Sequence, residues 1–468
     1  MNTKLKYLTL SILGLLLYIL FSIVSLNLFG NYSIPLIYSI PIALIIIIKY
    51  EVRKLFYLFI IFLPILQHYN FIAIEIGDFI ITPSSIYLII LFMLAFYDNT
   101  EEKISLSYKS IPNNSKILLI IVVVSSIISQ LINYNNMHNN AKQLLLFYTG
   151  IIESLFFIFI INKYYMKYLN DIILCIVLSV LSSVIVAFIE IQSIGFSIVN
   201  IYMNRVAIGF GYHNTNLFGI VSALLIPVTI YYYRFGHKIN YTYSVVITIC
   251  LFSLFCLSLL TLNRGTILVL FFQIVMMGVP KQLRKTMSVV IIAICLVGLY
   301  NYDLILIYSD RFSGVEVGEK ITDPSALYRL EAWKVGFESI ISNPFGLGAG
   351  GFQQYWENHG IDPTFFLGTP HQLFLSIAVD YGFLSAISFL LLLVIMIWKG
   401  FIQFIRKNNV LLYTTSISFL SYLIYGMITD GELSHLSGSV YPNNAFTFFL
   451  ILIIFIHYGS EKFENENS

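Results

Sequence analysis

The sequence has little charge for its length. Aspartate, glutamate, lysine and arginine make up 11% of the 468 residues, whereas hydrophobic residues make up 58%. A soluble domain carries about 25% charged residues, so this composition excludes an ordinary soluble protein and indicates a chain that lies largely in lipid. The net charge of +2 does not point to nucleic acid, and we expect no nucleic-acid partner.

Cysteine is also scarce, and its positions form no motif. Because the four cysteines lie inside apolar runs, we expect neither a disulfide framework nor a cysteine metal site. These residues are Cys175, Cys250, Cys256 and Cys295.

The N-terminal apolar run resembles a signal peptide but is too long to be one. Lys4 and Lys6 precede it, and it continues to about Phe29 without a small-residue cleavage site after it. We therefore interpret this run as a retained first transmembrane helix.

Apolar stretches of roughly 15–24 residues, close to the ~20 that cross a bilayer, recur along the whole chain. The sequence therefore predicts an all-α, polytopic integral membrane bundle of about 12–14 transmembrane helices. We place the spans near 7–29, 33–48, 55–74, 79–97, 116–132, 143–161, 171–191, 216–233, 242–261, 265–279, 286–308, 373–398, 409–428 and 444–458.

Basic residues test this topology through the positive-inside rule. With a cytoplasmic N-terminus, the short inner loops are all basic, and the outer segments hold few lysines and arginines outside one long loop. We therefore predict that both termini are cytoplasmic. The chain divides into N-terminal helices (1–204), helices with arginine-bearing outer segments (205–308), a large outer loop (309–372) and C-terminal helices (373–468).

Two outer arginines, Arg205 and Arg264, stand alone in short segments against this trend. One interpretation is that each snorkels to lipid headgroups from the interface. The other is that each stays outside because it must hold an anion. The residue pattern by itself leaves both open.

The large outer loop contains its own structure. Asp323 and Pro324 are typical of a helix start, apolar residues follow at helical spacing, and Asn343-Pro344 ends the helix. This helix either lies on the outer membrane surface or packs across the mouth of the bundle. A glycine-rich turn follows (346–351). As a phosphate-binding signature it is weak, and a plain tight turn explains it equally well.

Three blocks of the sequence together are similar to one known family. They are RVAIGFGYHNTNLFGIVSALLIP (205–227), LTLNRGTILVLF (260–271), and YRLEAWKVGFESIISNPFGLGAGGF with TPHQLFLSIAVDYGFLSAISFLLLL (328–352 and 369–393). The order of an arginine, a second arginine, a long loop and a histidine helix resembles the O-antigen ligase/polymerase superfamily of bacterial membrane proteins. The chain departs from the family at His213, where proline is usual, and at Tyr381–Ser385, where Gly-Leu-Leu-Gly is usual.

The resemblance implies a GT-C-like bundle and a glycosyltransferase that uses an undecaprenyl-diphosphate-linked glycan. It also implies a large periplasmic or extracellular loop and a location in the bacterial inner membrane. A diphosphate leaves readily when its growing charge is neutralised, and guanidinium groups do this through bidentate bonds. We therefore expect neither metal nor cofactor.

These requirements select the candidate site residues. Arg205, Arg264 and Arg329 are predicted to bind the diphosphate, and His213 and Asn214 to line the glycan path beside Arg205. His371 begins the helix at 373, and an imidazole takes up a proton near neutral pH. We predict that Arg264 and His371 are catalytic, with His371 as the base that activates an acceptor hydroxyl. A lone histidine at a helix boundary is otherwise commonly interfacial or structural.

The first functional hypothesis is a polymerase that joins lipid-linked repeat units of an O-antigen or capsule. The alternative is a ligase that transfers finished polymer to lipid A core or to protein. A flippase that moves lipid-linked sugar without chemistry is the third alternative, and the absence of a clear internal repeat counts against it. Expected partners are undecaprenyl-diphosphate-linked glycans and membrane lipid, with a chain-length regulator and a flippase as further candidates.

Two other polar features carry less weight. Residues 429–435 (TDGELSH) hold carboxylates and a histidine, but their spacing matches no standard metal site, so a solvated loop is the simpler interpretation. Glu153 lies within an apolar run and is a functional candidate for that reason alone.

Overall fold

A computed structural model describes most of the chain from residue 52 to residue 429. The described ranges are 52–66, 74–76, 79–81, 83–97, 113–133, 155–161, 169–205, 208–212, 214–235, 241–300, 324–358 and 369–429, with a few isolated positions besides. The predicted spans 7–29 and 33–48, and most of 143–161 and 444–458, lie outside these residues.

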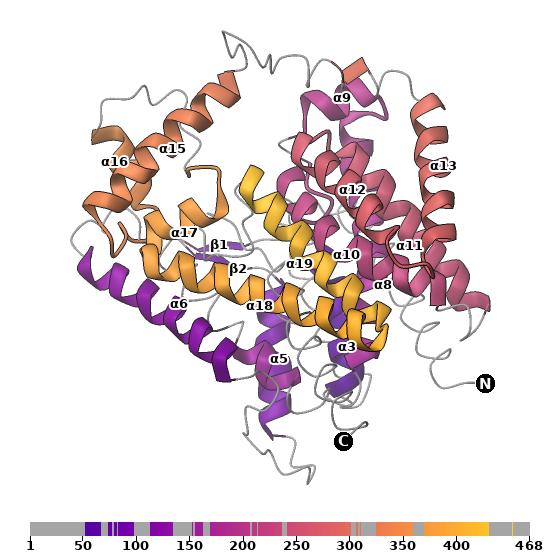
Figure 1. The fold of residues 1–468 in the computed structure, drawn as a ribbon, viewed down its shortest axis with the longest axis horizontal. Helices are drawn as coiled ribbons and strands as arrows, with labels where there is room; N and C mark the ends of the chain where they lie inside the picture. The colour runs from indigo at the N-terminus through magenta and orange to yellow at the C-terminus, as the bar shows by residue number, and fades with distance from the viewer. Residues whose placement is uncertain are drawn as a thin grey trace.

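The described elements are helices, apart from one short hairpin (Figure 1). In chain order they are α3 (Val52–Leu66), β1 (Ile74–Ile76), β2 (Phe79–Ile81), α5 (Pro83–Tyr97), α6 (Asn113–Ile132), α8 (Leu169–Ile194), α9 (Ile198–Met203), α10 (Thr215–Phe235), α11 (Tyr241–Leu260), α12 (Arg264–Met277), α13 (Arg284–Tyr300), α15 (Pro324–Ser342), α16 (Gly351–Asn358), α17 (Leu373–Tyr381), α18 (Phe383–Lys407) and α19 (Val410–Ile428).

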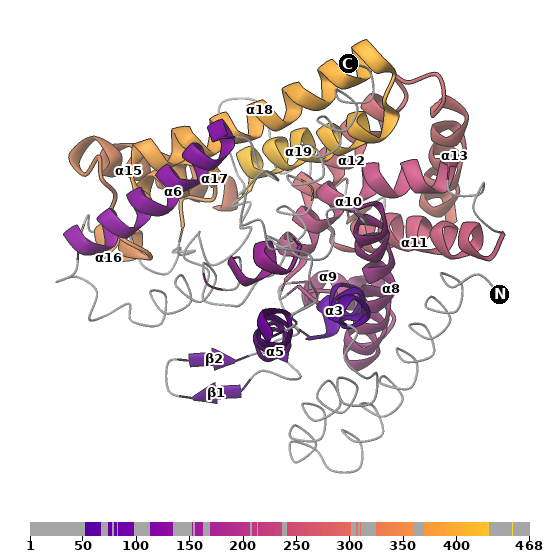
Figure 2. The same ribbon diagram turned by 90° about the horizontal axis from the view of Figure 1, so that it is seen from below.

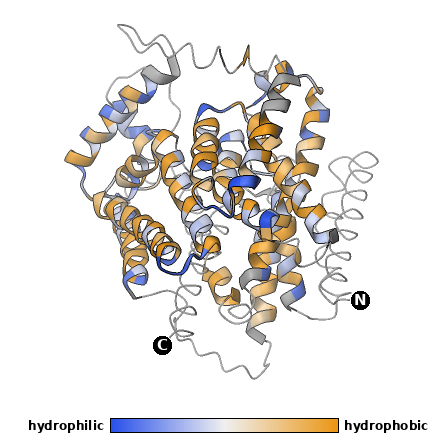
Figure 3. Ribbon diagram, turned by 45° about the vertical axis from the view of Figure 1, so that its right-hand side comes forward, coloured by the Kyte–Doolittle hydropathy of each residue, from blue (hydrophilic) through white to orange (hydrophobic). Residues whose placement is uncertain are grey.

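Six helices within the described ranges are long and apolar enough to cross a membrane: α6, α8, α10, α11, α18 and α19. Hydrophobic residues run along most of the length of the described helices (Figure 3). On α11 and α12, for example, Phe252 and Phe271 are exposed, as expected for helices that face lipid. The prediction of an all-α polytopic membrane protein is confirmed.

The most enclosed helix is α10, which packs against α8, α11, α12 and α19. The long helices α18 and α19 run side by side (Figures 1 and 2). They approach closely because Gly400 has no side chain; a Cβ there would collide with the Ser416 hydroxyl. Small residues of this kind allow close helix packing in lipid, where apolar burial contributes little to association.

Two predicted spans are broken in the structure, and a third, at 79–97, begins with β2 before α5 starts at Pro83. The span at 373–398 is two helices, because Gly382 adopts φ +91° between α17 and α18. A Cβ on Gly382 would also meet the Phe345 backbone at 2.9 Å. The span at 55–74 is shorter than predicted, since α3 ends at Leu66 and the antiparallel hairpin β1–β2 follows it. Apolar composition alone does not reveal either break.

The helix predicted in the large loop is confirmed as α15. Its inner face packs with α16 on α17, so it packs onto the bundle rather than standing apart. The buried cluster that joins the three helices consists of Tyr328, Ala332, Val335, Phe352, Trp356, Leu375 and Val379.

Helix ends that were assigned to the same side of the membrane meet in the structure. The Arg234 Nε on α10 donates to the Gln282 carbonyl at 3.0 Å, and the Gln282 amide donates to Asn408 at 3.2 Å. These bonds join the end of α10 to the α12–α13 and α18–α19 turns, which were all predicted to be cytoplasmic. The other ends of α10, α12 and α19 carry the candidate site.

Candidate active site at the ends of α10, α12, α17 and α19

Three polar side chains lock the helix ends together. Asn263 is the N-cap of α12, and its Oδ1 accepts from the Gly265 amide at 2.8 Å. Its Nδ2 donates to the side chain of Asn216 on α10 and, at 3.2 Å, to the Tyr425 hydroxyl on α19. The Tyr425 hydroxyl in turn donates to the Asn216 carbonyl at 2.8 Å. The N-termini of α10 and α12 are therefore fixed against the C-terminus of α19.

Arg264 is the first residue of α12 and directly follows this junction. Its side chain is half-buried. The partial positive charge of a helix N-terminus adds to that of the guanidinium there. Close packing holds the position, since a Cβ on Gly219 would collide with the Tyr425 hydroxyl, and one on Gly265 would meet the Thr429 methyl at 3.1 Å.

Arg329 reaches the same junction from α15. Its Nη1 donates to the Ile428 carbonyl at 3.2 Å, at the end of α19. The last carbonyls of a helix lack intrahelical partners, and a cation is favourable beside them. The Arg329 Nε is buried without a hydrogen-bond partner among the described residues.

His371 lies at the start of α17, just before the N-cap Gln372. Its ring meets the Tyr328 ring edge-on, with centroids 6.0 Å apart. Tyr328 directly precedes Arg329 on α15, so the same turn of α15 carries Arg329 and packs against His371. The start of α17 also contacts α19, because a Cβ on Gly426 would meet the Leu373 side chain at 2.8 Å.

Arg205 follows α9 at the N-terminal end of α10. Its Nη1 donates to the Tyr202 carbonyl at 3.2 Å, and its guanidinium lies over the Tyr202 ring, 4.8 Å from the centroid. The Thr215 hydroxyl donates to the Arg205 carbonyl at 3.1 Å. Since Thr215 precedes Asn216, the structure brings the Arg205 segment to the same helix ends.

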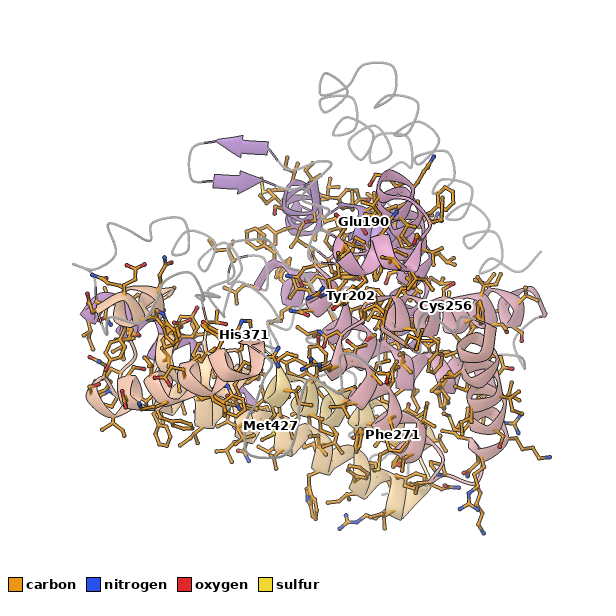
Figure 4. The ribbon with its side chains drawn as sticks, turned by 90° about the horizontal axis from the view of Figure 1, so that it is seen from above. Glu190, Tyr202, Cys256, Phe271, His371 and Met427 are labelled. Carbon is orange, nitrogen blue, oxygen red and sulfur yellow. The ribbon has the colours of Figure 1, made fainter. Side chains whose placement is uncertain are left out.

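The labelled residues in Figure 4 show this arrangement. His371 lies on the side of α15 and α17, Tyr202 lies on the side of α9 and α10, and Met427, near the end of α19, lies below both in this view. Phe271, further along α12, lies away from the junction.

Backbone strain is concentrated in the same segments. Outside glycine, four described residues have positive φ, and three of them are Phe210 (51°), Leu262 (52°) and His371 (54°). They lie in the segments that carry Arg205, Arg264 and the predicted base. Left-handed backbone is uncommon for such residues and clusters at functional sites.

The structure describes Asn214 but not His213, the two residues predicted to line the glycan path. The Asn214 Oδ1 accepts from the Leu217 amide at 2.9 Å, so this side chain caps α10. A role for Asn214 along the glycan path remains a prediction. His213 lies outside the described residues.

The glycine-rich turn wraps around the end of α17. The amides of Leu347 and Gly348 donate to the carbonyls of Val379 and Asp380, at 2.7 and 3.0 Å. The Ser129 hydroxyl on α6 also donates to the Asp380 carbonyl, at 2.7 Å. These amides are occupied within the protein, which favours the plain tight turn over a phosphate cradle.

Beneath this turn lies a buried carboxyl group that the sequence did not single out. Burial raises the pKa of Asp380 to about 8, while a smaller opposing effect comes from a hydrogen bond with the Gly350 backbone. The group lies on α17, outside the candidate membrane spans.

No group of three or more His, Cys, Asp and Glu side chains is arranged to hold a metal ion within the described part of the chain. The acidic segment 430–435 and Glu153 fall outside that part. Sequence reasoning assigned no role to Glu190, Asn216, Asn263 or Tyr425, although Asn216 and Asn263 lie in two of the blocks that carry the family resemblance.

The comparison with known proteins agrees with this geometry. No curated protein matches the chain. Residues 217–390 match the model of the O-antigen ligase family, and this range contains most of α10, Arg264, Arg329, His371 and the start of α18. The match supports the assignment of the chain, a membrane protein, to the O-antigen ligase/polymerase superfamily, which implies an activity of the glycosyl-transfer type.

Proposed function

We propose that the protein is a polysaccharide polymerase at the outer face of the bacterial inner membrane. It transfers a growing glycan from undecaprenyl diphosphate onto the next lipid-linked repeat unit of an O-antigen or capsule. The observation that carries the proposal is that the last turn of α19 is contacted by Arg329, by Gly265 beside Arg264, and by Leu373 at the start of the helix that follows His371. Both termini lie in the cytoplasm in this proposal.

The arginines act on the leaving group. The bond between the anomeric carbon and the diphosphate oxygen breaks, and negative charge grows on that oxygen. Arg264 and Arg329 come from different elements, so they approach a diphosphate from two sides, and Arg205 adds a third contact from the α10 end. Donors fixed before the reaction stabilise such charge, and loss of one typically costs about 2.7–4 kcal/mol of transition-state stabilisation.

His371 acts on the acceptor. The acceptor hydroxyl oxygen forms the new bond to the anomeric carbon, and its proton passes to the imidazole. A direct displacement of this kind inverts the anomeric configuration. The metal-independent mechanism rests on guanidinium groups alone for charge neutralisation.

The second candidate is a ligase that transfers finished polymer to lipid A core or to protein. The description of the matched family favours it. The same arginines and histidine serve both reactions, since only the acceptor differs.

A gel of surface glycans from a strain that lacks the gene distinguishes these functions. A polymerase predicts a ladder that collapses to one repeat unit on its anchor. A ligase predicts loss of anchored glycan while long polymer accumulates on undecaprenyl diphosphate. An unchanged ladder would contradict both. Complementation with His371→Asn should fail to restore the ladder, and lipid-linked units should then remain on the outer leaflet rather than inside.

A further inference from the structure

Glu190 is a buried acid near the end of the membrane helix α8. Its side chain is 6% exposed. The carboxylate accepts from the Phe210 amide at 2.8 Å and from the Gly209 amide at 3.2 and 3.3 Å. An ionisable residue at this depth is costly, so its presence calls for a specific role.

The segment that Glu190 holds is strained and tightly enclosed. Phe210 and Gly211 both have positive φ, at 51° and 92°. A Cβ on Gly211 would meet Pro64 of α3 at 2.7 Å. The Phe210 ring also packs edge-on against Phe218 of α10, with centroids 5.2 Å apart. Successive amides in such a conformation form a concave group of donors that favours an anion, and here the Glu190 carboxylate fills it.

The carboxylate of Glu190 and its bonds to the Gly209 and Phe210 amides, called the Glu190 clamp below, lie in the loop that begins at Arg205. The loop from Arg205 to Thr215 is closed at its ends by the bond between the Thr215 hydroxyl and the Arg205 carbonyl. Glu190 binds the middle of the same loop, at the amides of Gly209 and Phe210. Figure 4 shows Glu190 and Tyr202, which stacks on Arg205, in the same region of the molecule.

We infer that Glu190 is a positioning residue, which holds the 205–212 segment through its carboxylate and so sets the Arg205 guanidinium for the anionic leaving group. This inference rests on the proposed function of Arg205. Glu190 itself touches no substrate, because its oxygens are engaged with backbone amides.

The first test is Glu190→Gln. The amide has the same shape but only one acceptor oxygen, so one of the two backbone amides then faces an NH₂ group. We expect transfer to fall about ten-fold, the order expected when hydrogen bonds to a charged group are lost. The assay uses purified protein in liposomes with lipid-linked repeat units extracted from the deletion strain. Glu338→Gln removes an exposed carboxylate on α15 and should stay within about two-fold of wild type.

A double-mutant cycle separates positioning from a purely structural role. If Glu190 acts through Arg205, Glu190→Gln should change transfer less than about two-fold in an Arg205→Ala background. A purely structural defect would lower the melting temperature equally in both backgrounds. It would also reduce transfer by the same factor in both, so that the double variant loses the product of the two single losses. Multiplying effects would therefore overturn the inference.

A spin label two residues before Arg205 measures how firmly the Glu190 clamp holds this segment, and it does so independently of transfer activity. The label is placed by Met203→Cys in a chain whose four native cysteines are replaced by serine. We expect greater label mobility with Glu190→Gln, and unchanged mobility would overturn the inference. If Arg205→Ala keeps full activity, the proposed role of Arg205 fails, while the label still decides whether Glu190 holds the segment.

Discussion

Tyr425→Phe is the most direct test of the junction that supports Arg264. The substitution removes one hydroxyl, which donates to the Asn216 carbonyl at 2.8 Å and accepts from the Asn263 amide at 3.2 Å. Two hydrogen bonds are lost at a buried site, which should lower the free energy of unfolding by about 1–3 kcal/mol. Because Asn263 caps α12, the cap and Arg264 lose their fixed position.

The same helix offers a matched control. The Tyr413 hydroxyl donates to the Met276 carbonyl at 2.7 Å, near the opposite end of α19. Tyr413→Phe should therefore cost about 1 kcal/mol of stability without touching the site. In the liposome assay, Tyr425→Phe should reduce transfer about 10–100-fold, since small misplacements of a catalytic group are costly, and Tyr413→Phe should stay within about two-fold.

Each variant needs two measurements, the melting temperature in detergent and the rate of transfer. Equal activity losses in both variants would show that stability alone decides the result. Full activity of Tyr425→Phe would show that the junction does not position Arg264, and the reasoning would then be wrong.

Three further predictions concern charge, packing and pH. Arg264→Lys should reduce transfer at least about 100-fold, because an ammonium cannot bind a diphosphate through two parallel bonds. Arg284→Lys, at the end of the bundle away from the site, should leave transfer unchanged in the same liposome assay. Gly219→Ala should lower the melting temperature, because its Cβ would collide with the Tyr425 hydroxyl, and an unchanged value would contradict the close helix approach. Burial raises the pKa of Asp380 from 3.8 to about 8, so the folded state binds the proton more tightly than the unfolded state. Stability should therefore fall as pH rises from about 4 to about 8. Asp380→Asn should flatten that slope in melting curves recorded across this range, and a slope equal to that of wild type would assign the pH dependence elsewhere.

The large loop also contributes residues to the candidate site. The helix α15 packs on α17 through a buried cluster and delivers Arg329 to the end of α19. The glycine turn after α15 then fastens the loop to the end of α17 and to α6. Loop residues thus complete a site whose other parts come from membrane helices.

The sequence alone determined the features that depend on local chemistry. Low charge and apolar runs predicted the membrane helices, and Asp323, Pro324 and the apolar spacing predicted α15. The start of α15 at Pro324 was predicted in this way, because capping depends only on residues that are neighbours in the chain. The choice of Arg205, Arg264, Arg329 and His371 depended on their unusual places in outer segments and on the family resemblance.

Tertiary structure decided which of these residues meet. The junction joins Asn263 to Asn216 across 47 positions and to Tyr425 across 162, and no local pattern encodes pairs so far apart. The break at Gly382 depends on Phe345 lying against it, and the role of Glu190 depends on a loop that returns to the end of α8. Such features arise from the packing of whole helices, because a buried polar group finds its partner only after distant segments have been brought together.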